Sequence, residues 1–184
     1  MNDWQIENLR LRTAELSVAP STVRKAGAPG TVRAAREALK SVDLGRFAVD
    51  SKSKFLEELD RETQTVRRRL PSGARHWGIA RKVLNIFLRS CVQHRALSAA
   101  LGLARLESWL EIPLDSYTAR GIRMCSGETL PRWKSVKSLS PEQSAAYQAA
   151  ARRLAQRVGC RPVHLEACWW RTNTDHCKCI PRVR

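Results

Sequence analysis

Apolar residues recur along this chain with a helical period almost from end to end. Phe55, Leu59, Val66 and Leu70 stand at intervals of four and seven, which places one apolar face along residues 52–70. The same period predicts helices over residues 2–17, 31–42, 79–91, 95–110 and 140–158. No segment shows the strict alternation typical of a half-buried strand. The pattern therefore predicts an all-α fold.

Capping residues indicate where two of these helices begin and end. Ser140 is followed by a proline and, three positions after the cap, by Gln143, which together form a strong start signal. Gly159 marks the end of that helix. A shorter helix is expected to begin at Asp115 or at the following serine.

The length of 184 residues fits one compact domain. We expect a single helical domain over residues 1–184, divided into N-terminal helices (1–50), a central segment (52–125) and a C-terminal helix with a cysteine-rich tail (126–184). The longest apolar run spans about five residues, far below the length of a membrane-spanning helix. The N-terminus resembles no export or transit signal, so a cytoplasmic protein is expected.

The charge is strongly basic and unevenly spread. The chain has 33 Lys and Arg against 17 Asp and Glu, a formal net charge of +16. Residues 1–75 have a net charge of +5, and residues 76–184 a net charge of +11. Such an excess typically matches a polyanion, most often DNA or RNA. A membrane surface would call for a basic amphipathic helix or a lipidation motif, and the sequence shows neither.

Four of the six cysteines lie within the last 25 residues, together with His164 and His176. Their spacing matches no pair of C-x2-4-C motifs of the kind that binds zinc. We therefore expect ordinary thiols and predict neither a metal nor an organic cofactor, although a metal-stabilised regulator stays open as a weaker alternative. The six are Cys91, Cys125, Cys160, Cys168, Cys177 and Cys179.

Two short segments stand out when they are compared with each other. The first, GIARKVLN, covers residues 78–85, and the second, IPLDSYTAR, covers residues 112–120. Asp115 in the second segment follows Lys82 in the first by 33 positions.

This ordered pair resembles the motifs of the helix-hairpin-helix DNA glycosylase superfamily, G-h-G-x-K-T-A-N and P-h-D-T-H-h-x-R. Gly78 aligns with the first hairpin glycine, Lys82 with the catalytic lysine and Asn85 with the asparagine. Asp115 aligns with the catalytic aspartate and Arg120 with the arginine. The long gap and the small helical frame are most similar to the archaeal 8-oxoguanine DNA glycosylases. The resemblance implies a helix-hairpin-helix-like DNA-binding element.

The resemblance also implies a reaction, DNA glycosylase activity with AP lyase activity on an oxidised purine such as 8-oxoguanine. A neutral Lys82 amine would attack C1′, expel the base and form a Schiff base that permits β-elimination. The Asp115 carboxylate would stabilise the sugar cation or transfer a proton.

Further residues are expected to hold the DNA. Lys82, Asn85 and Arg89 share one polar stripe of a helix. Since the target base must be flipped out of the duplex, an aromatic side chain should receive it. The candidates for that base pocket are Trp77, Trp109 and Trp133, and the predicted DNA contacts are Gly78, Arg75, Arg81, Asn85, Arg89, Arg120 and Arg123.

Departures from the motifs favour an alternative, a non-catalytic basic helical module that binds nucleic acid or a partner protein. Ala80 replaces the second hairpin glycine, and Ser116 and Tyr117 replace the Thr-His pair. The glycosylase hypothesis requires Lys82 and Asp115 to share a cleft with an aromatic residue nearby and basic residues at its rim. We expect the protein to be a monomer in either case.

Overall fold

The computed structural model describes residues 1–24 and 28–169. Over these residues the fold is all-α, with no strand, as the apolar period predicts. Its helices are α1 (Asp3–Ser17), α2 (Thr31–Lys40), α3 (Lys52–Arg69), α4 (Trp77–Gln93), α5 (Arg95–Ala100), α6 (Ser116–Ser126), α7 (Pro141–Val158) and α8 (Glu166–Trp169). None of the helices in this part of the chain combines the length and the apolar character needed to cross a bilayer.

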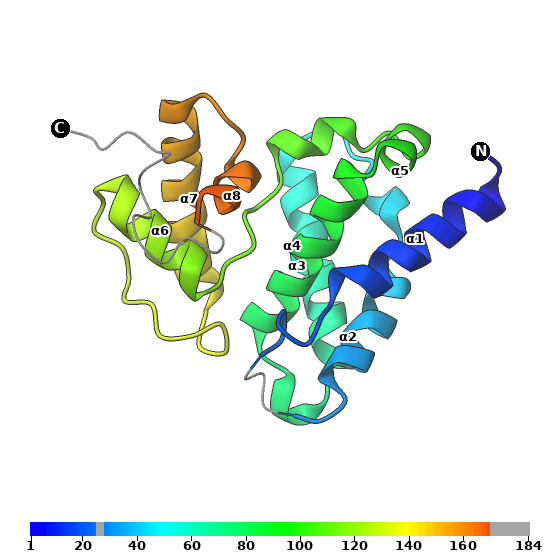
Figure 1. Ribbon diagram of the computed structural model, residues 1–184, viewed down its shortest axis with the longest axis horizontal. Coiled ribbons are helices and arrows are strands. Elements are labelled where there is room, and N and C mark those ends of the chain that lie inside the picture. The colour runs from blue at the N-terminus through cyan, green and yellow to red at the C-terminus, as the bar shows by residue number, and fades with distance from the viewer. Residues whose placement is uncertain (25–27, 170–184) are drawn as a thin grey trace.

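The buried apolar residues form two clusters. One lies among α1 to α5 and includes Phe55 and Phe87, and the other lies among α6 to α8 and includes Tyr147 and Trp169. The two clusters part near residues 110–112. The segment between Leu110 and α6 runs from one group of helices to the other (Figure 1).

The predicted caps of the second group are confirmed. Ser140 forms a capping box with Gln143, and Gly159 ends α7 in the left-handed conformation at φ 69°. Asp115 caps α6, since its Oδ1 accepts hydrogen bonds from the backbone N–H groups of Tyr117 and Thr118, both at 3.0 Å. These two hydrogen bonds fix the Asp115 carboxyl group at the start of α6.

The stretch over residues 95–110 differs from the single helix that was expected. It divides into α5 and a 3₁₀ segment, Ala104–Ser108. Gly102 between them has φ 64°, a left-handed conformation that ends a helix at low cost for glycine.

Close packing of α8 on α6 depends on a glycine. A Cβ atom at Gly121 would lie 2.3 Å from the ring of Trp169, whose side chain is almost fully buried. The absence of a side chain at position 121 therefore lets α8 approach α6, which brings Glu166 at the start of α8 toward α4.

Candidate active site

The structure brings Lys82 and Asp115 together. Lys82 lies in the second turn of α4, and its Nζ is 3.3 Å from Oδ2 of Asp115. The two side chains are 12% and 21% exposed, so the pair is largely shielded yet still reachable from solvent. The carboxylate has a divided role, because Oδ1 caps α6 while Oδ2 faces the amine.

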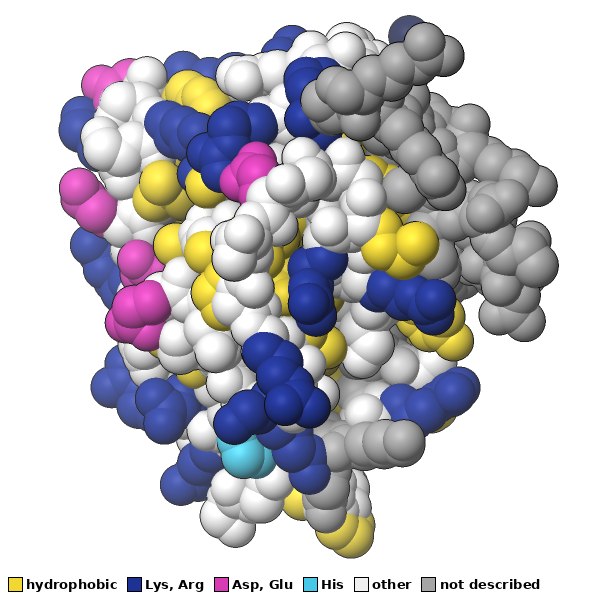
Figure 2. All heavy atoms as spheres, turned by 90° about the vertical axis from the view of Figure 1, so that its left-hand side faces the viewer, with side chains coloured by type: hydrophobic (Ala, Val, Ile, Leu, Met, Phe, Trp, Pro, Cys, Tyr) yellow, Lys and Arg dark blue, Asp and Glu magenta, His cyan; other side chains and the backbone are white. Residues whose placement is uncertain are grey.

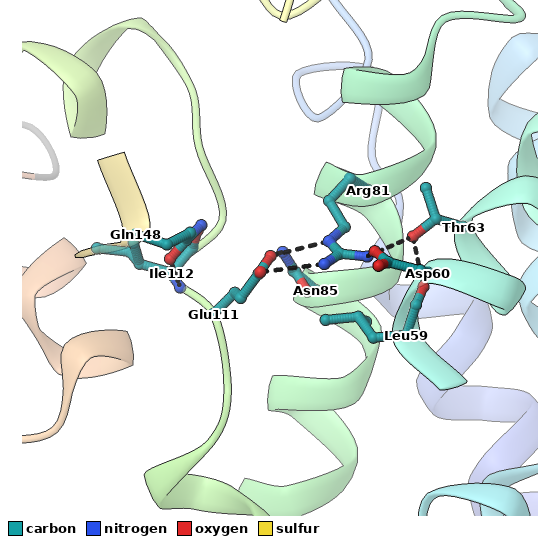
Figure 3. Close-up of polar contacts among 8 residues, drawn as sticks. All are labelled: Leu59, Asp60, Thr63, Arg81, Asn85, Glu111, Ile112 and Gln148. Carbon is teal, nitrogen blue, oxygen red and sulfur yellow. Dashed lines mark hydrogen bonds and ion pairs between the residues drawn. The ribbon is translucent and has the colours of Figure 1, made fainter. Parts of the chain in front are cut away.

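A buried ion pair holds the segment that leads to Asp115 (Figure 3). Arg81 of α4 donates two hydrogen bonds to Glu111, from Nε to Oε2 at 2.8 Å and from Nη2 to Oε1 at 3.0 Å. Asn85, one turn further along α4, donates to the same Oε2 at 3.1 Å. Glu111 is 8% exposed, so these three donors compensate for the removal of its charge from water.

Further bonds attach this network to α3 and α7. Nη1 of Arg81 donates to Asp60 at 2.7 Å and to Thr63 at 3.0 Å, which joins α4 to α3. On the other side, the amide of Gln148 accepts from the Ile112 backbone N–H at 3.1 Å and donates to the Ile112 carbonyl at 2.8 Å (Figure 3). The backbone a few residues before Asp115 is thus clamped between α4 and α7, which sets the position of its carboxylate relative to Lys82.

The same contacts overturn the prediction that Arg81 and Asn85 bind DNA. Their side chains lie in the interior, at 5% and 2% exposed, and their donors are occupied by Glu111. The stripe predicted on α4 is therefore directed into the protein at these positions and does not form a phosphate-binding surface.

Gly78 is not a hairpin glycine. It is the second residue of α4, and a Cβ atom there would lie 2.2 Å from the carbonyl oxygen of Val136 and 2.8 Å from Cβ of Leu139. Its role is to admit the backbone of the segment between α6 and α7, so the expected phosphate contact at Gly78 is wrong. Since α4 begins at Trp77, Lys82 lies in the second turn of this helix and not directly after a hairpin.

Gly78→Ala is accordingly expected to destabilise the protein by about 1–3 kcal/mol through overpacking. This loss should exceed the roughly 1 kcal/mol that alanine gains from its helix propensity. Gly73→Ala is the matched control, because its Cβ atom would meet only Ala28 at an ordinary 3.4 Å. Urea unfolding measures both changes. Equal stability of the two variants would contradict the assignment.

A second ion pair lies beside the first. Arg89 follows Lys82 by two turns of α4 and pairs with Glu166 of α8, so Arg89 is engaged within the protein rather than free for the predicted DNA contact. Burial raises the pKa of the Glu166 carboxyl above its usual value, although Arg89 acts to lower it. The charges of Asp115 and Lys82 also act on this pKa, so the two pairs are within electrostatic reach of each other. The sequence analysis did not predict a role for Glu166, because this residue belongs to no recognisable motif.

The recess beside Lys82 is narrow. Its lining includes Asn85, Leu114, Leu139 and Ser144, and it has no room for a nucleobase. The Ser144 hydroxyl is buried there without a hydrogen-bond partner in the described part of the chain. A nucleobase would therefore have to bind at a different surface of the protein.

The three candidate tryptophans lie in different places. Trp109 packs on Phe55 in the first core cluster, with ring centroids 6.2 Å apart, so it is a core residue and not part of a base pocket. The Arg81 guanidinium lies over the indole of Trp77, with its Cζ atom 5.2 Å from the centroid of the Trp77 ring. Trp133 alone is joined to the residue after Asp115, because its Nε1 donates to Oγ of Ser116 at 3.3 Å.

A groove of about 580 Å³ runs between one face of α6 and residues 128–133, with Trp133 and Ser116 in its lining. Arg120 and Arg123 also line it, and both are exposed. Arg75, also exposed, lies before α4 and donates from Nε to the Leu70 carbonyl at 2.8 Å. Figure 2 looks onto the side of the molecule formed by α6 and α7, where Lys and Arg side chains outnumber acidic ones.

Among the described residues, no three His, Cys, Asp or Glu side chains converge as a metal site would require. His164 instead lies 3.1 Å from a carboxylate oxygen of Glu107. Three residues of the predicted cysteine-rich tail, His176, Cys177 and Cys179, are outside the described residues.

Comparison with known proteins adds no relative. No protein-family model, no curated protein and no solved structure matches this chain.

Proposed function

We propose that the protein is a DNA glycosylase with AP lyase activity, in which Lys82 is the nucleophile and Asp115 the essential carboxylate. The observation that carries the proposal is the ion pair of 3.3 Å between these two side chains. They come from separate segments of the chain, and a clamped backbone holds one of them in place. The basic charge of the chain supports a nucleic-acid substrate.

The pair would act on the sugar of the damaged nucleotide. The Lys82 ammonium gives a proton to the Asp115 carboxylate, and the amine forms a bond to C1′ as the glycosidic bond breaks and its electron pair leaves with the base. Asp115 returns that proton to the departing base. The lysine adduct passes a proton from its nitrogen to the ring oxygen and opens to a Schiff base, and loss of a C2′ proton to water then expels the 3′ phosphate. Asp115, which its two N–H donors hold in place, faces the cationic sugar and lowers the energy of that state. The substrate implied is an oxidised purine such as 8-oxoguanine.

A non-catalytic nucleic-acid-binding module remains the second candidate, and one observation favours it. Gly78 is engaged in backbone packing, and Arg81 and Asn85 in hydrogen bonds to Glu111, so these three residues do not form the phosphate-binding hairpin that the family resemblance implies. Binding would then depend on α6 and on the segment that follows it.

Asp115→Asn tests the catalytic proposal, because asparagine caps a helix about as well as aspartate but has no charge. We expect stability to stay within about 0.5 kcal/mol of wild type. Base release and strand cleavage on duplexes with 8-oxoguanine or an abasic site should fall by about 100-fold or more.

Asp43→Asn is the matched control, since Asp43 also caps a turn, accepting from Gly45 N–H at 2.9 Å, but outside the candidate site. Activity of Asp115→Asn equal to that of this control would overturn the role of Asp115. Wild-type protein that binds the duplexes and a wider panel of modified bases without any cleavage would support the non-catalytic module.

A further inference from the structure

The groove beside Asp115 has a rigid aromatic wall. Trp133 donates to Ser116 on α6, and its ring meets Tyr147 of α7 edge-on, with centroids 5.7 Å apart and planes at 79°. Tyr147 is almost completely buried, and its hydroxyl donates to the carbonyl of Pro131 at 2.8 Å. The indole is therefore held in place from two sides. Its side chain loses little conformational entropy when a ligand stacks on it.

The opposite wall is cationic. Ser116, Arg120 and Arg123 stand at spacings of four and three on one face of α6, and both arginines lie free of ion pairs among the described residues. The carboxylate in the groove, Glu128, is engaged by Arg153 of α7, which donates from Nε at 2.9 Å. This hydrogen bond also holds the pKa of Glu128 below its usual range. The charge left available to a ligand is thus that of the two arginines.

The size of the groove fits a nucleotide. Its volume of about 580 Å³ lies within the range of small-molecule sites. A flat stacking surface opposite two guanidinium groups is the combination that proteins use to bind unpaired nucleic-acid strands. A peptide with acidic side chains would satisfy the arginines but would leave the partly exposed indole of Trp133 without a planar partner.

We infer that this groove binds an unpaired nucleotide of a nucleic-acid strand, with its base stacked on Trp133 and the neighbouring phosphates bound by Arg120 and Arg123. The inference rests on the nucleic-acid part of the proposed function and not on its chemistry. Ser116, which lines the groove, directly follows Asp115 in the chain, whereas the recess beside Lys82 is too narrow for a base.

Two probes separate stacking from charge: a fluorescein-labelled oligothymidylate and an oligomer of equal length made of abasic phosphodiester units. Trp133→Ala should weaken binding of the oligothymidylate by about 10-fold while changing binding of the abasic oligomer by less than about twofold. Trp4→Ala is the matched control, because Trp4 is 72% exposed on the distant α1. Fluorescence anisotropy measures all of these affinities.

The double variant Arg120→Gln/Arg123→Gln should weaken both probes and lower the slope of log K against log salt by about 1.4, or about 0.7 for each lost phosphate contact. Arg33→Gln, an exposed arginine on α2, is the control for charge alone. The inference is overturned if Trp133→Ala behaves as Trp4→Ala does, or if oligoglutamate displaces the oligothymidylate from wild type and Trp133→Ala equally well.

These outcomes are separate from those for the glycosylase proposal. Loss of base stacking in Trp133→Ala, together with absence of base release by wild type, would reject the enzyme and retain the groove. Base release that is unchanged in Trp133→Ala, together with unchanged binding, would reject the groove and retain the enzyme.

Discussion

Glu111→Ala is expected to lower the free energy of unfolding by about 3 kcal/mol, the largest stability effect that we predict for a single change in this chain. The substitution removes the two Glu111 oxygens that accept from the buried Arg81 guanidinium, one of which also accepts from Asn85. A buried charge without its partner is costly, and the loss stays near the lower end of the usual range because Asp60 still neutralises Arg81.

Urea unfolding monitored by circular dichroism measures this effect. Glu107→Ala is the matched control, since Glu107 makes a more exposed pair with His164 and should cost less than about 1 kcal/mol. Losses of similar size in the two variants would contradict the role given to the Glu111 network. The fraction of Glu111→Ala that stays folded should also lose activity, because Glu111 positions the backbone that carries Asp115.

Lys82→Gln is expected to reduce strand cleavage at an abasic site by at least about 1,000-fold, because the amide cannot form a Schiff base. Lys82→Arg makes the test sharper. Its guanidinium retains the positive charge beside Asp115 but is no nucleophile at any working pH. If Lys82 acts only as a structural cation, Lys82→Arg should retain activity.

We expect both Lys82 variants to be inactive and to unfold near the wild-type urea concentration, since a half-buried pair of this kind contributes modestly to stability. Lys134→Gln is the control, because Lys134 is an exposed lysine that follows Trp133. Cleavage by Lys82→Arg comparable to that of Lys134→Gln would exclude the amine as the nucleophile.

The helices could be predicted from the sequence because they depend on local patterns, and the central pair was expected because two segments resemble the motifs of a known family. Phe55, Leu59 and Val66 define a helical face by their spacing alone, and Ser140 with Gln143 marks a helix start. The proximity of Lys82 and Asp115 followed from the order of two motifs. The helix signals lie within a few residues of one another, whereas the two motifs are 33 positions apart and were related only through the family resemblance.

The residues that were assigned wrongly depend on contacts across the fold. Whether Gly78 meets a phosphate or a backbone is decided by Val136 and Leu139, which are about 60 positions away and belong to no motif. Arg81 was counted among the DNA contacts because a basic residue is usually exposed. Arg81 is buried because it pairs with Glu111, and the apolar period of the sequence does not reveal that pairing.

Glu166 illustrates the same limit from the other direction. A single glutamate near the end of the chain gives no signal in the sequence, yet the contact of Trp169 with Gly121 brings its helix against α6 and places the carboxylate beside Arg89. Close approach through a glycine is visible only once the two helices are placed.

The most direct test of the central claim is covalent trapping. The wild-type protein is incubated with a duplex that contains one abasic site, in the presence of sodium borohydride, and the adduct is digested and mapped by mass spectrometry. The account predicts one reduced adduct, on Nζ of Lys82, which is absent from Lys82→Arg and present in Lys134→Gln. An adduct on another amine, or none from a protein that binds the duplex, would contradict it.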